Sequence, residues 1–358
     1  MSVETNSLSG NQKQLLVTFD YELFLGNRSG SVDECMIAPT NKLIVLLEKY
    51  NVSAIFFVDT TYLLRLRKQA ESTPACADDY KRISDQLCLL VRKGHFVYPH
   101  LHPHWLDAEY LPESNQWRLN NTQKYLFKNI SEKDRLLVFD GSVSLLKDVL
   151  HPEFPDYKIN AFRAGGWSIQ PFTDFKQYFE KHMFIYEFSV LRGFYQFTDA
   201  QFFDFSSAPS KSIYRFSDDV CVEDKKGPYL QFNISSIYIP PATGWLNKIW
   251  MKLYMKITND HTFNKGEGQP SRIVSHINPS SPEGKDLASS HWERVAVELL
   301  TQVKLRKYLH FIKLNDYMHF ISHPKMITDH NLAVLDKFLK KAFNKYQIVT
   351  NFQMMIPQ

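Results

Sequence analysis

The first half of the chain alternates short apolar runs with amphipathic stretches, and this alternation restricts the fold more than any other feature. Apolar runs at residues 15–19, 54–58 and 95–98 predict buried strands. The stretches 40–50 and 78–93 have helical spacing, with Thr40 expected to cap the first helix and Gly94 to close the second. Such alternation predicts a parallel sheet, either doubly wound or closed into a barrel.

The same alternation continues to the end of the chain, with one interruption. Further strands are expected at 136–139, 161–162, 184–186 and 317–322, and further helices up to residue 150 and at 171–181, 290–307 and 329–345. Residues 196–290 break the pattern, because they are rich in Phe, Ser, Asp, Pro and Gly, and we expect one large insertion or set of active-site loops there. We therefore predict a disordered leader at 1–13 and a single catalytic domain at 14–358.

Composition excludes several classes of function. The net charge is +4 over 358 residues and no Lys/Arg block concentrates it, so no nucleic-acid partner is expected. The four cysteines form no CxxC pair, which argues against a disulfide framework or a thiolate zinc site. The polar N-terminus lacks the apolar core of a signal peptide, and no apolar run approaches the roughly 20 residues that span a bilayer. These features predict a cytoplasmic protein.

Carboxylates and imidazoles follow two of the predicted strands. Asp20 and Glu22 come directly after the run 15–19, and on an extended backbone residues two apart point to the same side. His100, His102 and His104 follow the strand at 95–98, and imidazole is the commonest protein ligand for zinc and similar ions. A helical turn would place His100 and His104 on one face. The alternative is that the two acids are solvated at the end of a strand and the three histidines lie in a polar loop by chance.

Two further clusters follow later strands. In AFRAGGWS (161–168), Arg163 could pair with Asp20 and keep it ionised, and the two glycines let the backbone approach a ligand closely. A structural arginine beside a glycine turn is the alternative. His319 and His323 lie four apart on the strand at 317–322 and its end, so they should share a face.

Taken in order, these clusters resemble the motifs of the polysaccharide deacetylases, carbohydrate esterase family 4 or the NodB-homology group. The run from Thr18 to Glu22 is similar to the family's TFDD motif, and 94–104 aligns without gaps on its G-H-E-[IL]-x-x-H-[ST]-x-x-H motif. The run 162–166 is similar to FR-P-P-x-G, and 321–323 to L-x-H. The resemblance covers roughly residues 15–325.

The resemblance implies an irregular, incomplete (β/α) barrel and a metal-dependent hydrolase that removes an N-acyl group, commonly N-acetyl, from a sugar or glycan. It implies Asp20 as general base, His323 as general acid and Arg163 as the group that orients Asp20. Its metal, usually zinc, would be held by Glu22, His100 and His104, although such a set also accepts nickel, cobalt or iron. His102, Gly166 and Trp167 are further candidates for contacts with the metal or the substrate, and a backbone N–H near Gly166 would bind the oxyanion.

Several departures keep other functions open. Tyr21 separates the two acids of the first motif, and Phe96 stands where the second motif has Glu. Glu187, in the run YEFSV, is the residue that aligns with the acid of the fourth motif. Alternatives are therefore a deformylase or amide hydrolase acting on a lipid-linked or nucleotide-linked sugar or a non-sugar amide, and a catalytically weak member that binds a glycan or a partner. The absence of a signal peptide favours an intermediate of surface-polysaccharide biosynthesis over mature cell wall. The oligomeric state is left open.

Residues 244–257 (GWLNKIWMKLYMKI) predict an amphipathic helix. Trp245, Ile249 and Leu253 recur at helical spacing, beside a row of lysines that includes Lys248 and Lys252. A helix lying in a membrane interface has this pattern and would suit a lipid-linked substrate, with the protein peripheral at the inner membrane face. Packing on the barrel or between subunits is the alternative.

Overall fold

The computed structural model describes residues 12–25, 29–119, 122–198, 200–258 and 291–356. Most of the predicted leader and residues 259–290 of the predicted insertion lie outside this part of the chain. Gln12 and Lys13, which the leader was expected to include, belong to the first strand.

A nine-stranded main sheet organises the described part of the chain, in the order β10-β11-β7-β6-β3-β2-β1-β14, with β15 also pairing with β1. All its neighbours are parallel except β10 and β11. The strands are β1 (Gln12–Tyr21), β2 (Ala54–Asp59), β3 (Phe96–Leu101), β6 (Ala161–Ala164), β7 (Tyr186–Glu187), β10 (Ile213–Phe216), β11 (Tyr229–Phe232), β14 (Tyr317–Ser322) and β15 (Gln347–Val349).

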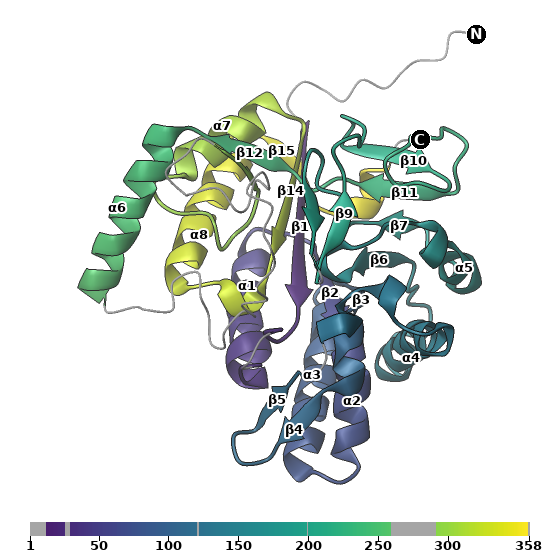
Figure 1. Ribbon diagram of the computed structural model, residues 1–358. Helices are drawn as coiled ribbons and strands as arrows, with labels where there is room; N and C mark the ends of the chain where they lie inside the picture. Colours follow the sequence, from purple (N-terminus) through teal and green to yellow (C-terminus); the bar gives the residue numbers. More distant parts are fainter. Residues whose placement is uncertain (1–11, 26–28, 120–121, 199, 259–290, 357–358) are drawn as a thin grey trace.

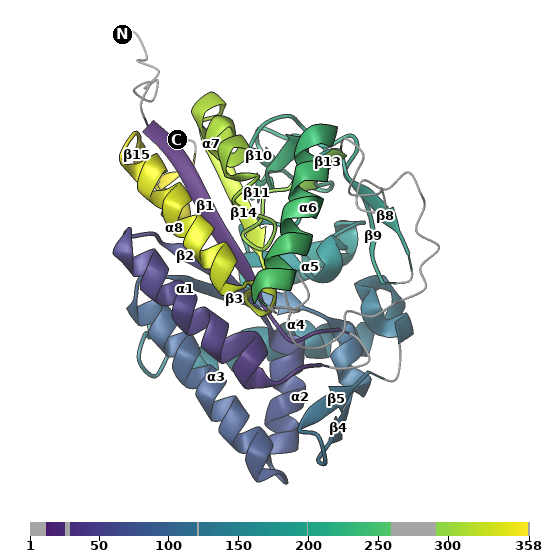
Figure 2. The ribbon, with the colours of Figure 1, turned by 90° about the vertical axis from the view of Figure 1, so that its left-hand side faces the viewer.

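Helices lie around the outside of this curved sheet (Figures 1 and 2). They are α1 (Ala38–Lys49), α2 (Thr60–Ala70), α3 (Pro74–Arg92), α4 (Glu132–Leu150), α5 (Thr173–His182), α6 (Pro241–Thr258), α7 (Leu305–Leu314) and α8 (Asp329–Phe343). Short hairpins pair β4 (Glu109–Leu111) with β5 (Gln116–Arg118) and β8 (Tyr195–Phe197) with β9 (Phe202–Asp204), while β12 (Ser236–Ile239) pairs with β13 (His291–Arg294). The curled, mostly parallel sheet with its outer helices confirms the predicted incomplete (β/α) barrel.

Parallel pairing brings the polar strand ends together. Asp59 pairs with His100 and His100 with Arg163, so the ends of β2, β3 and β6 coincide. Phe19 pairs with Ser322, which places Asp20 beside the end of β14. Strands of such a sheet have their active groups at the carboxyl ends, and this register assembles them from five strands: β1, β2, β3, β6 and β14.

Three local predictions were wrong. Residues 136–139 are not a strand but lie inside α4, whose N-cap Ser131 accepts a hydrogen bond from the Asp134 N–H, so capping outweighs the β propensity of LLVF. Residues 290–307 are not one helix, because β13 pairs with β12 and α7 begins only at Leu305. Thr40 is no cap but a buried residue within α1.

The described part of 196–290 is more regular than expected. It supplies β8 to β12 and α6, and β11 pairs with β7, so it extends the main sheet as well as carrying hairpins. No helix in the described ranges combines the length and the hydropathy that crossing a membrane would require.

Candidate metal centre

An ion pair between Arg163 and Asp20 lies at the centre of the site. Arg163 is fully buried on β6, and its Nη1 lies 2.6 Å from Asp20 Oδ1. Its remaining donors reach the Thr18 hydroxyl (2.8 Å) and the Phe188 carbonyl (3.1 Å). Burial alone would raise the pKa of Asp20, but Arg163, with smaller contributions from nearby imidazoles, lowers it below its usual value. Asp20 is therefore a carboxylate held in one orientation, as the sequence predicted of this pair.

Glu22, His100 and His102 converge beside that pair. His102 Nε2 lies 2.8 Å from Glu22 Oε2 and 3.0 Å from His100 Nε2, and His100 Nε2 lies 3.5 Å from the same carboxylate oxygen. All three side chains are buried. Their ligand atoms form the group of described His, Cys, Asp or Glu residues that could hold one metal ion.

The donor set fits a divalent ion. His100 Nδ1 lies 2.9 Å from the Arg163 carbonyl oxygen, which can only accept, so Nδ1 carries the proton and Nε2 presents its lone pair to the cluster. Glu22 Oε2 is buried, and its polar neighbours are the two imidazole Nε2 atoms, at 2.8 Å and 3.5 Å. Two imidazoles and one carboxylate with an open fourth position are the set found in catalytic zinc sites.

The second histidine of this group is His102, whereas the family motif implies His104. His104 is fully buried in the 3-10 turn Pro103–Asp107, and its ring stacks on Tyr125 with centroids 4.2 Å apart. Burial lowers the pKa of His104 well below its usual value, so the ring is neutral. The cause is the backbone: His102 is extended (φ −118°, ψ 89°), so the strand alternation continues past His100 and gives His100 and His102 one face.

Gly165, the first glycine of GGW, packs against the backbone of Leu101 and the ring of His102. A Cβ on Gly165 would lie 2.2 Å from the Leu101 carbonyl oxygen and 2.8 Å from His102 Nδ1. Only glycine allows β6 to approach the end of β3 so closely. The candidates Gly166 and Trp167 both have positive φ, and the Trp167 ring packs on Phe203 with centroids 5.7 Å apart.

His323 faces the same centre from the end of β14. Its Nε2 lies 3.6 Å from Asp20 Oδ2, and its Nδ1 lies 3.1 Å from Glu298 Oε1. Burial would raise the pKa of Glu298, but His323 lowers it, so this acid is charged behind the imidazole. A carboxylate on one ring nitrogen fixes the orientation of the other and stabilises the imidazolium.

His319 lies on the side of Arg163 and Thr18. It is buried, its Nε2 lies 3.0 Å from the Thr18 hydroxyl, and its Nδ1 lies 3.1 Å from the Asn233 carbonyl oxygen. Burial lowers its pKa well below the usual value, and it supports Arg163 and Thr18 rather than facing the metal group.

Sequence reasoning missed three residues of the site. Glu298 comes from the segment between β13 and α7, where nothing in the local pattern marks it. Lys325 donates hydrogen bonds to Glu22 Oε1 (2.9 Å) and the Leu23 carbonyl (2.6 Å), and its place two residues after His323 was the available signal. Asp59 ends β2, accepts from the Trp105 indole at 2.5 Å, and burial raises its pKa to about 6. Strand-end position could have identified it.

Glu187, which was aligned with the acid of the fourth motif, does not lie beside His323. It is buried on β7 and accepts a hydrogen bond from the Ser189 N–H at 2.8 Å, and it lies outside the metal group. Burial raises its pKa to about 7. The carboxylate beside His323 is instead Glu298.

Comparison with known proteins adds little beyond this geometry. No protein-family model matches the chain, and the curated proteins contain no match. Among solved structures, the chain is similar to a protein described as a polysaccharide deacetylase from Mycobacterium smegmatis (12% identity, 99% of this chain and 92% of that chain, TM-score 0.49). It is also similar to a peptidoglycan deacetylase from Bacillus subtilis (12%, 97% and 92%, 0.36) and to an allantoinase (10%, 97% and 90%, 0.46). At these identities and TM-scores the likenesses assign no activity.

Proposed function

We propose that this chain is a metal-dependent hydrolase that removes an N-acyl group, N-acetyl above all, from a sugar or glycan intermediate. The observation that carries the proposal is the convergence of a metal-binding group on an ion-paired carboxylate and a carboxylate-backed histidine. Glu22, His100 and His102 would supply the ligands, and Asp20 and His323 lie beside them, with His323 Nε2 3.6 Å from Asp20 Oδ2. The order of motifs along the chain supports the sugar-amide class.

When bound, a divalent ion would polarise the acyl carbonyl and lower the pKa of water toward about 7. Asp20 Oδ2 is the oxygen left free by Arg163, so it can accept a proton from water during attack. His323 presents Nε2 to the same space and can donate a proton to the departing amine, without which an amide leaving group is poor. Glu298 stabilises the imidazolium that this donation requires.

The test is acetate or formate release from N-acylated oligosaccharides by zinc-loaded protein. Asp20→Asn and His323→Ala should keep zinc and lose about 10²- to 10⁴-fold of the turnover, the usual contribution of a positioned acid or base. Asp140→Asn and His182→Ala are the matched controls, since that pair is a surface ion pair at 2.7 Å on α4 and α5. Full activity of both site variants would refute the mechanism. A chain that takes up no divalent ion would favour the binding-only alternative.

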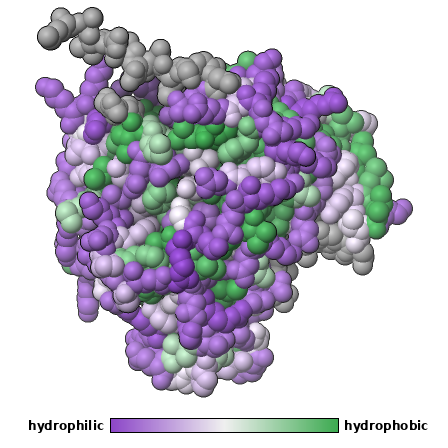
Figure 3. All heavy atoms as spheres, turned by 180° about the vertical axis from the view of Figure 1, so that it is seen from behind, coloured by the Kyte–Doolittle hydropathy of each residue, from purple (hydrophilic) through white to green (hydrophobic). Residues whose placement is uncertain are grey.

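We also propose that α6 contacts a membrane, which favours a lipid-linked substrate. Five large apolar side chains on this helix are 37–81% exposed: Trp245, Leu246, Ile249, Leu253 and Ile257. In Figure 3 an apolar band lies along the right-hand margin, where α6 projects from the body. The helix carries lysines and no acidic residue, so an anionic bilayer complements it in both hydrophobicity and charge.

The helix also packs on α8, the helix that follows Lys325 in the chain. Trp250 and Tyr254 of α6 pack on His330, with centroids 4.5 and 4.9 Å from its ring, and His330 lies near the start of α8, five residues after Lys325. Co-sedimentation with phosphatidylglycerol vesicles should fall in the double variant Lys252→Glu, Lys256→Glu. The same charge change at exposed Lys133 and Lys147 of α4 should leave it unaltered. Unchanged co-sedimentation in both variants would remove the membrane proposal.

A further inference from the structure

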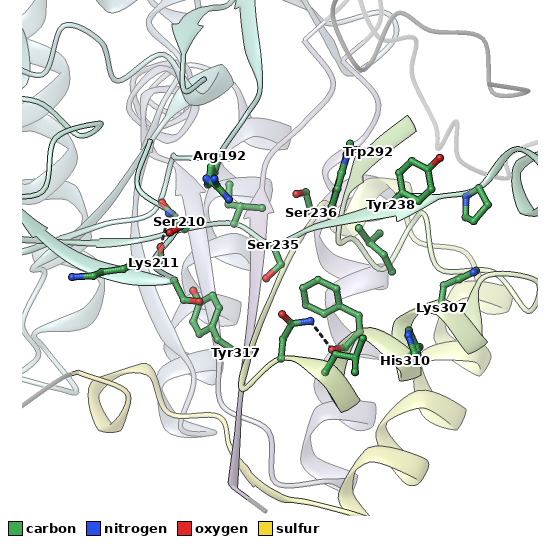
Figure 4. A pocket seen from close by; sticks show the side chains of 18 residues that line it. Arg192, Ser210, Lys211, Ser235, Ser236, Tyr238, Trp292, Lys307, His310 and Tyr317 are labelled. Atoms are coloured by element: carbon green, nitrogen blue, oxygen red, sulfur yellow. Dashed lines mark hydrogen bonds between the residues drawn. The ribbon is translucent and has the colours of Figure 1, made fainter. Parts of the chain in front are cut away.

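A second concave site lies at the opposite end of β14 from the metal group. It is a groove of about 500 Å³ lined by β12, Trp292 of β13, α7 and residues 210–212, and it includes Tyr317, the first residue of β14 (Figure 4). His323 follows the last residue of that strand. At about 3.3 Å per residue, the length of β14 separates the groove from the metal group by roughly 20 Å. The groove therefore plays no part in the chemistry described above.

The charge of the groove has one sign. Its basic lining residues are Arg192, Lys211, Lys307 and His310, and among the described residues no Asp or Glu lines it. Lys211 is paired with Glu223 at 2.6 Å, so Arg192 and Lys307 are the principal cations. Figure 4 shows Arg192 and Ser210 at one end and Lys307 and His310 at the other. Positive groups spread along a concave surface attract a ligand with spaced negative charges.

Rings and hydroxyl groups occupy the space between these cations. Trp292 is 53% exposed and Tyr238 is 44% exposed, with ring centroids 5.7 Å apart. Serines at positions 210, 212, 235 and 236 add hydroxyl groups to the lining. Exposed aromatic faces beside a few polar groups are what a ring-shaped ligand needs for stacking and orientation.

We propose that this groove binds an acidic glycan, in which charged sugars contact Arg192 and Lys307 and a sugar ring packs on Trp292. The separation of the cations favours a polymer with repeated charges, because a nucleotide would need them gathered around one phosphate group. This inference rests on the proposed function in one respect: it names an acidic glycan as the substrate class that the enzyme would hold at a distance from its metal.

The experiment measures binding of an octasaccharide of alternating glucuronate and N-acetylglucosamine to the full chain by calorimetry. The Asp20→Asn background prevents turnover. We expect binding that weakens at least tenfold in the double variant Arg192→Glu, Lys307→Glu and, separately, in Trp292→Ala. A neutral chitooligosaccharide of the same length should bind at least tenfold more weakly, and added salt should weaken the acidic ligand only. Lys133→Glu with Lys147→Glu is the control for charge.

Absence of binding, or equal affinity in the control and the groove variants, would overturn the proposal. Tighter binding of uridine diphosphate than of the octasaccharide would also overturn it and assign the groove to a nucleotide. The groove variants should keep the circular dichroism spectrum and zinc affinity of the parent chain, which separates lost binding from lost folding. Because binding is measured without turnover, its failure would leave the proposed hydrolase intact, and an inactive enzyme would leave the groove testable.

Discussion

Replacement of His102 should cost far more zinc affinity than replacement of His104. In the structure His102 Nε2 lies 2.8 Å from Glu22 Oε2, whereas His104 stacks on Tyr125 at 4.2 Å and its two nitrogens have no hydrogen-bond partner among the described residues. Structural zinc sites with four ligands bind with about 10–16 kcal/mol, or roughly 3 kcal/mol per ligand. Loss of one ligand therefore weakens binding by roughly two orders of magnitude.

The assay is a competition titration of zinc against a chelating dye at pH 7.5. His102→Ala should show the hundredfold loss, and His104→Phe, which keeps an aromatic ring for the stack on Tyr125, should change the affinity less than about threefold. Urea denaturation of both metal-free variants controls for folding. The opposite result, with zinc lost in His104→Phe and kept in His102→Ala, would restore the ligand set that the family motif implies and refute the geometric argument.

Three further outcomes are expected. Arg163→Met should lower the free energy of unfolding, measured by urea denaturation, by about 3–5 kcal/mol, because Asp20 is left as a buried charge without its partner. Adding Asp20→Asn should recover part of this loss. No recovery in the double variant would contradict the pairing of Arg163 with Asp20. Glu187 has its pKa raised to about 7 from an ordinary 4.5, so the folded state binds more protons than the unfolded state between these values and this carboxyl reduces stability as pH rises. Glu187→Gln should therefore gain up to about 3 kcal/mol relative to the parent between pH 5 and pH 8, and a difference independent of pH would count against the shift. Glu298→Gln should lower kcat about 10- to 100-fold with zinc affinity unchanged, since the acid acts only through His323; an equal loss of zinc would show a broader structural role.

The alternation of strands and helices in the first half could be predicted in outline from periodicity, because a buried parallel sheet requires apolar runs separated by amphipathic helices. Helix α2 and strands β8 to β12 were not predicted. That Asp20 and Glu22 point to the same side also followed from the sequence alone, since it depends only on the two-residue period of an extended backbone. Arg163 and His323 were found because each follows a strand, and parallel strands end at one edge of a sheet. The mispredicted strand at 136–139 shows the limit, since a capped helix with buried Val138 and Phe139 overrides local β propensity.

Which histidine joins Glu22 and His100 in the candidate metal group depends on the backbone after His100. Pro103 disfavours a helical conformation at the residue before it, so His102 stays extended and joins the face of His100, and the helical turn begins only afterwards. The sequence contained that signal, and the motif alignment outweighed it. Lys325 reaches the site through a contact with Glu22, 303 positions earlier in the chain, and Glu298 through a contact with His323, 25 positions later. No local pattern records such a contact, because only the register of the sheet brings these side chains within a few ångströms of each other.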